Sequence, residues 1–306
     1  MKSSFLRSLV FTAGKDVKRP FLKVTVNKYI VKMDHTNTLR GHTYNILCLT
    51  HGDGLVYSGD VGGTIKTWKD NKCINTIKTK YPMWCLIYND GILYSGSYKV
   101  INAWKDGKVD GTIPASDVGV FCLAFHNGML YSGCDDPVIN VWKDYTYIIA
   151  LKGHTDGVNC LKFNDDILYS GSIDYTIKLW KDYTCIATLV NHRTYVNWIT
   201  FGHDLMYSGD ENGIIKVWRD NKCIASLEEH TEAISELICI DDELYSCSND
   251  RSILVWKDQK YMHTLATHEK CTDCFTYVDG VLYSGGEDET IKVWKEVGLL
   301  TKAALK

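Results

Sequence analysis

The 306-residue sequence has only four prolines, a small net charge and no long apolar run. No apolar stretch approaches the roughly 18 residues of a membrane-spanning helix, so no membrane partner is expected. The formal net charge is −3, and the lysines and arginines are spread along the chain instead of forming a stripe. This distribution argues against a nucleic-acid partner. The 45% hydrophobic and 12% aromatic content is ample for a large core.

A repeat of about 38 residues runs through the chain, marked by tryptophan. Seven tryptophans are separated by 36 residues once and by 38 residues five times. A Tyr-Ser pair precedes each of them, and a basic residue follows each. Such a period is typical of solenoids and propellers, in which each repeat is one supersecondary unit. The marking residues are Trp68, Trp104, Trp142, Trp180, Trp218, Trp256 and Trp294.

Four short strands are predicted within one repeat. In the clearest copy, alternating apolar segments cover 158–163, 167–172, 176–180 and 185–189. Short turns that each contain Asp separate these segments, at 164–166, 173–175 and 181–184. Four antiparallel strands repeated radially form a β-propeller, which leaves only short sheet edges. The sequence therefore predicts one all-β domain over residues 1–306.

The twelve cysteines predict a reducing compartment, the cytoplasm or the nucleus. Five of them recur at one repeat position, where a small apolar residue would fill the same slot in each unit. Equivalent positions of neighbouring repeats have poor geometry for disulfides. Cys271 and Cys274 have metal-ligand spacing, but no second such pair accompanies them, so we expect no metal ion and no cofactor. The periodic cysteines are Cys48, Cys85, Cys122, Cys160 and Cys274.

The chain resembles the WD-repeat family over residues 34–294. The resemblance rests on four features of the repeat: a Gly-His pair before the first strand, small residues at the end of the second strand, Asp in the following turn and Trp on the third strand. One departure from the family pattern is that Lys or Arg follows each marking Trp directly. In that family, His, Ser or Thr, Asp and Trp form a hydrogen-bonded set inside each blade. The resemblance implies three complete sets, which are His154, Ser170, Asp174 and Trp180; His230, Ser246, Asp250 and Trp256; and His268, Ser284, Asp288 and Trp294.

These sets favour a structural over a catalytic interpretation, because an active site occurs once whereas they recur. Gly62 and Asn212 stand where the first and fifth blades should carry Asp, and the second and third blades lack the His. We therefore expect incomplete sets there, and looser or different packing in blades one to three.

The number of blades has two interpretations. Residues 5–16 align without a gap to 163–174, which predicts a degenerate eighth blade in residues 1–33. In that case 295–306 would include the outer strand of the last blade. In the alternative, a seven-blade ring with an N-terminal extension, residues 35–42 supply that outer strand and fasten the two ends together.

Residues at two loop positions per blade are candidates for partner binding. In WD-repeat relatives, the face from which the His- and Asp-bearing loops emerge commonly binds peptides around the central channel. The resemblance implies the same face here, with an apolar arc over blades one to three and a polar, partly acidic arc over the others. The apolar candidates are Leu47, Val61, Trp84, Tyr98 and Phe121, and the polar-side candidates are Asp135, Asn159, Tyr195, Asn197, Glu211, Asp273 and Glu287.

The leading functional hypothesis is a non-catalytic scaffold or adaptor that binds a protein or peptide with apolar and basic anchor residues. The absence of an Arg cluster among the candidate positions argues against phosphopeptide binding. One alternative is that the aromatic residues only plug irregular blades. Two others are a propeller enzyme with an active site at the channel mouth and a structural subunit of a larger assembly.

Overall fold

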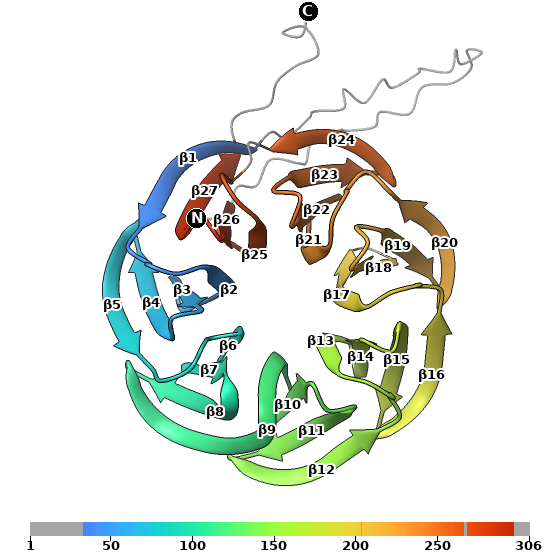
Figure 1. Cartoon of the computed structure of the whole chain (residues 1–306), viewed down its shortest axis with the longest axis horizontal. Coiled ribbons are helices and arrows are strands. Elements are labelled where there is room, and N and C mark those ends of the chain that lie inside the picture. The colour runs from blue at the N-terminus through green and yellow to red at the C-terminus, as the bar shows by residue number, and fades with distance from the viewer. Residues whose placement is uncertain (1–32, 203, 266–267, 297–306) are drawn as a thin grey trace, which may run out of the picture.

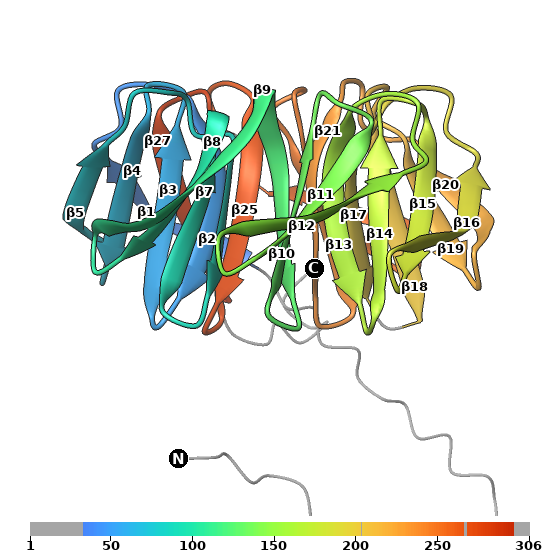
Figure 2. The same ribbon diagram turned by 90° about the horizontal axis from the view of Figure 1, so that it is seen from below.

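The computed structural model describes residues 33–202, 204–265 and 268–296, which form a ring of seven β-sheet blades around a central axis (Figure 1). No helix occurs among these residues. Within each blade the strands run antiparallel from the axis to the rim, and Figure 2 shows the blades standing side by side. The predicted all-β propeller is confirmed.

The strands follow the tryptophan repeat. Blade one contains β2 (Ile46–Gly52), β3 (Leu55–Asp60), β4 (Thr64–Lys69) and β5 (Lys72–Lys78). Blades two and three contain β6 (Cys85–Asn89), β7 (Ile92–Gly96), β8 (Tyr98–Lys105), β9 (Lys108–His126), β10 (Met129–Cys134), β11 (Val138–Lys143) and β12 (Thr146–Lys152). Blade four contains β13 (Val158–Asn164), β14 (Ile167–Ser172), β15 (Thr176–Lys181) and β16 (Thr184–Val190).

The last three blades repeat the pattern. Blade five contains β17 (Val196–Gly202), β18 (Leu205–Asp210), β19 (Ile215–Arg219) and β20 (Lys222–Leu227). Blade six contains β21 (Ile234–Ile240), β22 (Glu243–Ser248), β23 (Ile253–Lys257) and β24 (Lys260–Leu265). Blade seven contains β25 (Thr272–Val278), β26 (Val281–Gly286), β27 (Thr290–Glu296) and β1 (Met33–Arg40).

The first strand closes the ring. β1 pairs antiparallel with β27 and so occupies the outer place of blade seven, which the eight-blade hypothesis assigned to a strand within 295–306. β2 packs directly against both β6 and β25, which leaves no place in the ring for an eighth blade. The prediction of eight blades is therefore wrong, and the seven-blade alternative holds. Residues 1–32, which were to form the extra blade, lie outside the described residues.

Blades two and three are joined by a single strand. β9 pairs first with β8, as the outer strand of blade two, and then with β10, as the inner strand of blade three. The two blades thus form one seven-stranded sheet (Figure 1). The pairing of β9 with β8 jumps from Pro114 to Gly119, so the intervening residues bulge out of the ladder. Blades two and three therefore differ in packing from the rest, as expected, whereas blade one has ordinary four-strand pairing.

The blades pack through apolar side chains and the recurring thiols. Each marking tryptophan is buried, and so are Cys48, Cys122, Cys160 and Cys274. A Cβ added at Gly171 would lie 2.7 Å from the Sγ of Cys160, so glycine on the second strand makes room for the thiol. All twelve cysteines are free thiols. The interpretation of the periodic cysteines as core residues is supported by this packing.

Candidate functional site

In six of the seven blades, a β-bulge near one end of the inner strand leaves one residue without a partner on the neighbouring strand. In blade four, for example, Val158 pairs with Ser172 and Cys160 with Gly171, so Asn159 has no partner of its own. Bulges of this kind commonly direct a side chain toward a functional site. The face on which these bulges lie is called the top face below. The extra residues are Leu47, Phe121, Asn159, Asn197, Ser235 and Asp273.

These residues surround a central channel with a volume of about 610 Å³. Trp84, which precedes β6, occupies the corresponding place in blade two and lines the channel as well. The seven positions come from seven different blades, so the ring itself brings together residues far apart in the sequence. The channel is therefore a concave site to which all seven blades contribute.

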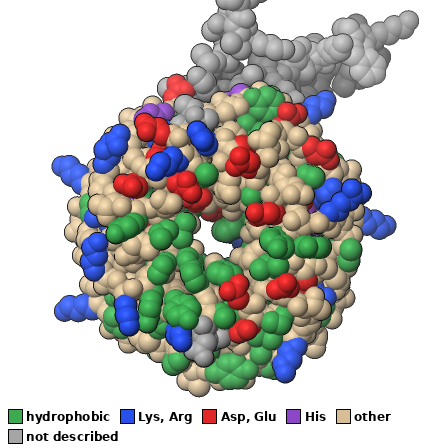
Figure 3. Space-filling view, in the orientation of Figure 1, with side chains coloured by type: hydrophobic (Ala, Val, Ile, Leu, Met, Phe, Trp, Pro, Cys, Tyr) green, Lys and Arg blue, Asp and Glu red, His purple; other side chains and the backbone are tan. Residues whose placement is uncertain are grey.

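An apolar arc lies on one side of the mouth. The rings of Trp84 and Phe121 lie 5.2 Å apart between centroids and are tilted by 55°. Trp84 lies directly on the backbone of Gly119, where any Cβ would overlap its indole ring. Exposed Val61 and Tyr98 extend the arc outward. Figure 3 shows hydrophobic side chains gathered beside the central opening on this side of the ring.

A polar arc occupies the other side. Asn159 donates a hydrogen bond to Asn197 at 3.3 Å, and Asn197 donates to Glu211 at 2.8 Å. Farther round, burial and the neighbouring carboxylates of Glu287 and Asp288 raise the pKa of Asp273 to about 7. Its Oδ2 is buried and accepts no hydrogen bond from the described residues. A cationic group placed beside Asp273 would offset the repulsion from these two carboxylates and favour the charged form of Asp273.

One further carboxylate lines the channel below the mouth. Glu236 stands at the repeat position that holds cysteine in five of the other six blades, and its Oε2 accepts a hydrogen bond from the backbone N–H of Phe275 in the next blade at 3.0 Å. Burial raises the pKa of Glu236 to about 8, although the Phe275 N–H and the Lys162 ammonium act in the opposite direction. A large fraction of Glu236 is therefore protonated at neutral pH.

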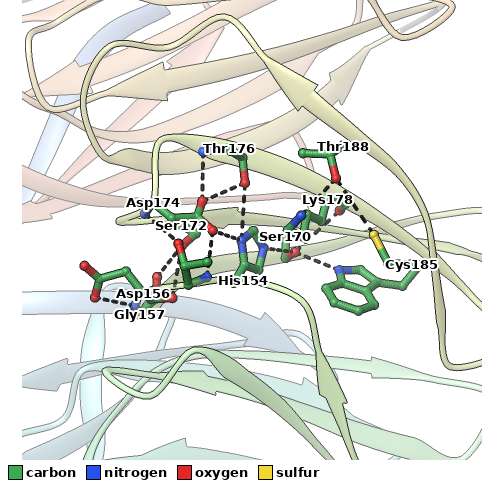
Figure 4. Close-up of polar contacts among 12 residues, drawn as sticks. His154, Asp156, Gly157, Ser170, Ser172, Asp174, Thr176, Lys178, Cys185 and Thr188 are labelled. Carbon is green, nitrogen blue, oxygen red and sulfur yellow. Dashed lines mark hydrogen bonds and ion pairs between the residues drawn. The ribbon is translucent and has the colours of Figure 1, made fainter.

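Behind the top face, hydrogen-bonded sets tie the loops to the blades. In blade four (Figure 4), Trp180 donates to Ser170 at 2.8 Å, and the His154 nitrogens lie 2.7 Å from Ser170 Oγ and from Asp174 Oδ2. Because an indole only donates and a carboxylate only accepts, the bonds run in one direction, from Trp180 through Ser170 and neutral His154 to Asp174. Burial lowers the pKa of His154. Burial alone would raise the pKa of Asp174, but hydrogen bonds from Thr176 and His154 outweigh it and set the value at about 2.

The same geometry recurs in the sets of His230 and His268, as the resemblance implied. Each His and Ser of these sets is buried. Because these sets recur with buried side chains and a single direction of hydrogen bonding, they are structural and hold each top loop in place.

Two further complete sets occur where incomplete sets were expected. In blade one, His42 contacts Asp60 and Ser58, both at 2.6 Å, and Trp68 donates to Ser58 at 2.8 Å. In blade five, His192 contacts Asp210 at 2.8 Å in the same way. The prediction that these blades lack the carboxylate is therefore wrong, because the aspartate stands at the end of the second strand, two residues earlier than in the other sets.

A family model for "WD domain, G-beta repeat" matches residues 33–69, 145–181, 183–219, 221–257 and 259–295. These five segments make up more than half of the chain. The chain belongs to the WD-repeat family. Each of the five matched WD repeats ends one residue after the tryptophan of a complete hydrogen-bonded set, whereas β6 to β11 of blades two and three lie between the first and second matches.

Solved structures share the propeller fold. The WD40 β-propeller domain of Doa1 is 20% identical, with a TM-score of 0.79 over 87% of this chain and 97% of that one. The computationally designed Ika8 protein is 23% identical, with a TM-score of 0.69 over 86% of this chain and 99% of that one. No curated protein matches the sequence. At these identities the likeness shows the fold alone.

On the top face of this WD-repeat ring, some candidate residues line the channel and the others lie on the rim. Leu47, Trp84, Phe121, Asn159, Asn197, Glu211 and Asp273 line the channel. The others lie on the rim, where backbone hydrogen bonds join neighbouring loops, as between Val61 and Asn45, Glu211 and Tyr195, and Glu287 and Cys271. Tyr195 packs against Tyr175 at 5.9 Å. Sequence reasoning missed Glu236, whose only signal was a carboxylate in the register of the periodic cysteines.

Within residues 33–202, 204–265 and 268–296, no group of three or more His, Cys, Asp or Glu residues is arranged to hold a metal ion. The same part of the chain contains no helix long and apolar enough to cross a membrane.

Proposed function

We propose that this WD-repeat protein is a non-catalytic scaffold or adaptor that holds a protein or peptide partner on its top face, over the mouth of the central channel. The observation that carries the proposal is the division of the mouth into an apolar-aromatic arc and an acidic arc. WD-repeat propellers commonly serve as protein-interaction scaffolds, and the residue at the bulge position on this face changes from leucine and aromatic residues to asparagine, serine and aspartate round the ring.

The apolar arc supports an anchor for a large apolar side chain. Trp84 and Phe121 are only partly buried, and their neighbours Val61 and Tyr98 are exposed. Contiguous exposed aromatic surface on a propeller rim favours binding, because aromatic residues provide much of the energy of protein interfaces. The alternative that these rings merely plug irregular blades accounts for Trp84 over Gly119 but not for exposed Tyr98.

The acidic arc supports a Lys or Arg on the partner. Asp135 and Glu211 are exposed, Glu211 and Asp273 line the channel, and Asp135 and Glu287 lie on the rim. Asp273 is the strongest candidate for a direct ion pair, since it lines the channel and lies near the carboxylates of Glu287 and Asp288. A partner with an apolar residue and a basic residue separated by the width of the mouth would fit both arcs.

The twelve free thiols favour a cytoplasmic or nuclear location for such a scaffold. Thiol-rich proteins of this kind are kept reduced in those compartments. This location is part of the proposal.

The proposal is tested by quantitative affinity enrichment with the wild-type chain and with the double variant Trp84→Ala/Phe121→Ala. We expect the variant to lose the proteins that the wild type retains, by at least roughly thirtyfold, because the loss of a single aromatic anchor already costs about 2 kcal/mol or more. The matched control is Ile224→Ala/Tyr261→Ala, which truncates two exposed residues on outer strands. Thermal unfolding verifies that both variants fold.

A charge variant tests the second arc. Asp273→Asn should weaken a partner with a basic anchor while leaving the apolar anchor in place. Unchanged retention by a folded Trp84→Ala/Phe121→Ala variant, or equal losses in the control variant, would remove the top face as the binding surface.

A further inference from the structure

The outer strand of blade three is an unusually apolar sheet edge. β12 is the last strand of the seven-stranded sheet and pairs only with β11 among the described strands. Tyr147, Ile148 and Ile149 follow one another along it and are 52%, 45% and 38% exposed. Figure 2 shows β12 lying obliquely across the outside of the ring, between β9 and β16.

Edge strands usually carry features that prevent pairing with another chain, most often charged side chains. The outer strands β5, β20 and β24 each begin with an exposed lysine, Lys72, Lys222 and Lys260. β12 begins instead with Thr146 and remains uncharged until Lys152, its last residue. β16 (Thr184–Val190) also lacks a charge, but among the described outer strands only β12 carries three consecutive exposed large apolar residues.

A bulge repeats at one position of every outer strand and offers a comparison within the chain. In β12 the extra residue is Ile148, since Trp142 pairs with Tyr147 and Val141 with Ile149. In β20 it is Ile224, which is 46% exposed. The two isoleucines thus have the same local geometry and nearly the same exposure. They differ in their neighbours, which are Tyr147 and Ile149 in β12 but Cys223 and Ala225 in β20.

A negative and a positive side chain flank this edge, so two antiparallel copies of it have complementary charges. Asp144 lies four residues before Ile148 and Lys152 lies four residues after it, and both are exposed. When two copies of β12 run antiparallel with their Ile148 residues opposite each other, the Lys152 of each copy lies beside the β11–β12 hairpin turn of the other copy, and this turn carries Asp144. The apolar residues 147–149 then meet their own counterparts. Such a pairing is isologous and closes at two chains.

We propose that β12 is a dimerisation edge, at which a second copy of this chain adds its own β12 antiparallel to form a two-fold symmetric dimer. The top face and the channel take no part in the contact, so the proposal is independent of partner binding. The two rings lie edge to edge, with both channel mouths accessible.

The test is sedimentation equilibrium of the full chain from about 1 to 100 μM. The expected mass rises with concentration from 34.7 kDa toward twice that value. Ile148→Lys should remain at the monomer mass throughout, because two lysines would face each other. The matched control Ile224→Lys places the same charge at the same bulge of another blade and should dimerise like the wild type.

A second variant keeps the test sharp if Ile148→Lys folds poorly. Lys152→Glu places a carboxylate near Asp144 of the other copy and should raise the dimer dissociation constant at least tenfold, and adding Asp144→Asn should recover part of the loss. A wild-type chain that stays at 34.7 kDa over the whole range would overturn the proposal. The proposal would also be overturned if Ile148→Lys and Ile224→Lys weakened the dimer equally.

Discussion

Glu236 provides a quantitative test of the packing between blades. Its carboxyl group lies at a position that holds cysteine in five other blades, and it accepts the Phe275 N–H across the blade boundary. Replacing it by glutamine keeps an acceptor for that N–H and removes the ionisable group. We therefore expect Glu236→Gln to stabilise the ring at alkaline pH and to have little effect in acid.

The size of the effect follows from the pKa. Burial raises the pKa of Glu236 from the ordinary 4.5 to about 8 in the folded chain. Because the folded state binds the proton more tightly, the wild type loses stability as the pH rises from about 4.5 to about 8. The full shift corresponds to about 5 kcal/mol at ~1.4 kcal/mol per unit, and contact with water in the channel reduces this to on the order of 2–3 kcal/mol.

The assay is urea unfolding of the wild type and of Glu236→Gln at pH 5, 7 and 9. The stability difference in favour of the variant should grow by on the order of 2–3 kcal/mol between pH 5 and pH 9. Glu269→Gln, an exposed substitution with the same change of formal charge, is the control and should show no such growth. A difference that stays constant across this range would refute the view that Glu236 is held protonated in the channel wall.

Three further predictions concern the top face. Asp60→Ala should cost about 3 kcal/mol of folding free energy in denaturant titrations, since it leaves buried His42 without its acceptor; a loss below about 0.5 kcal/mol would contradict the role of the set. Gly119→Ala should displace Trp84 and weaken partner binding about as much as Trp84→Ala does, as measured by partner titration; unchanged affinity would be inconsistent with this contact. Partner affinity should rise between pH 6 and pH 8 as Asp273 ionises near its pKa of about 7, and Asp273→Asn should abolish the dependence; an identical pH profile in the variant would exclude an ion pair at this site.

The repeat itself could be predicted because the requirements of a blade are local. Period-two alternation, turn residues and a tryptophan on the third strand all recur at one spacing, so strand order within a blade follows from the sequence. Asp53, Asp70 and Asp165 illustrate the turns, since each adopts a left-handed conformation with φ near +50° at a hairpin. Which residues surround the channel also followed from the register, because every blade contributes the same position.

Closure of the ring could not be decided from local pattern. The alignment of residues 5–16 with 163–174 is a similarity between segments, whereas the number of blades depends on which strand pairs with β27 over a distance of about 260 residues. The sequence of β1 satisfied either arrangement. Only the antiparallel contact of β1 with β27, together with β2 packing on β25, decides between them.

The two missed hydrogen-bonded sets show a different limit. A search at a fixed repeat position finds Gly62 and Asn212, and so overlooks Asp60 and Asp210 two residues before them. Both segments read Tyr-Ser-Gly-Asp, a shared tetrapeptide that could have revealed the second solution. Either aspartate position reaches the His Nδ1, because the turn between the second and third strands brings both next to the preceding loop.

The most direct test of the central claim places a photo-crosslinking amino acid at Tyr98 on the top face and, in a separate variant, at Tyr261 on an outer strand. The two tyrosines are 37% and 43% exposed, so accessibility is matched. We expect position 98 to capture the partner that Trp84→Ala/Phe121→Ala loses, and position 261 to capture none of it. Equal capture at both positions, or capture at 261 alone, would contradict binding over the channel mouth.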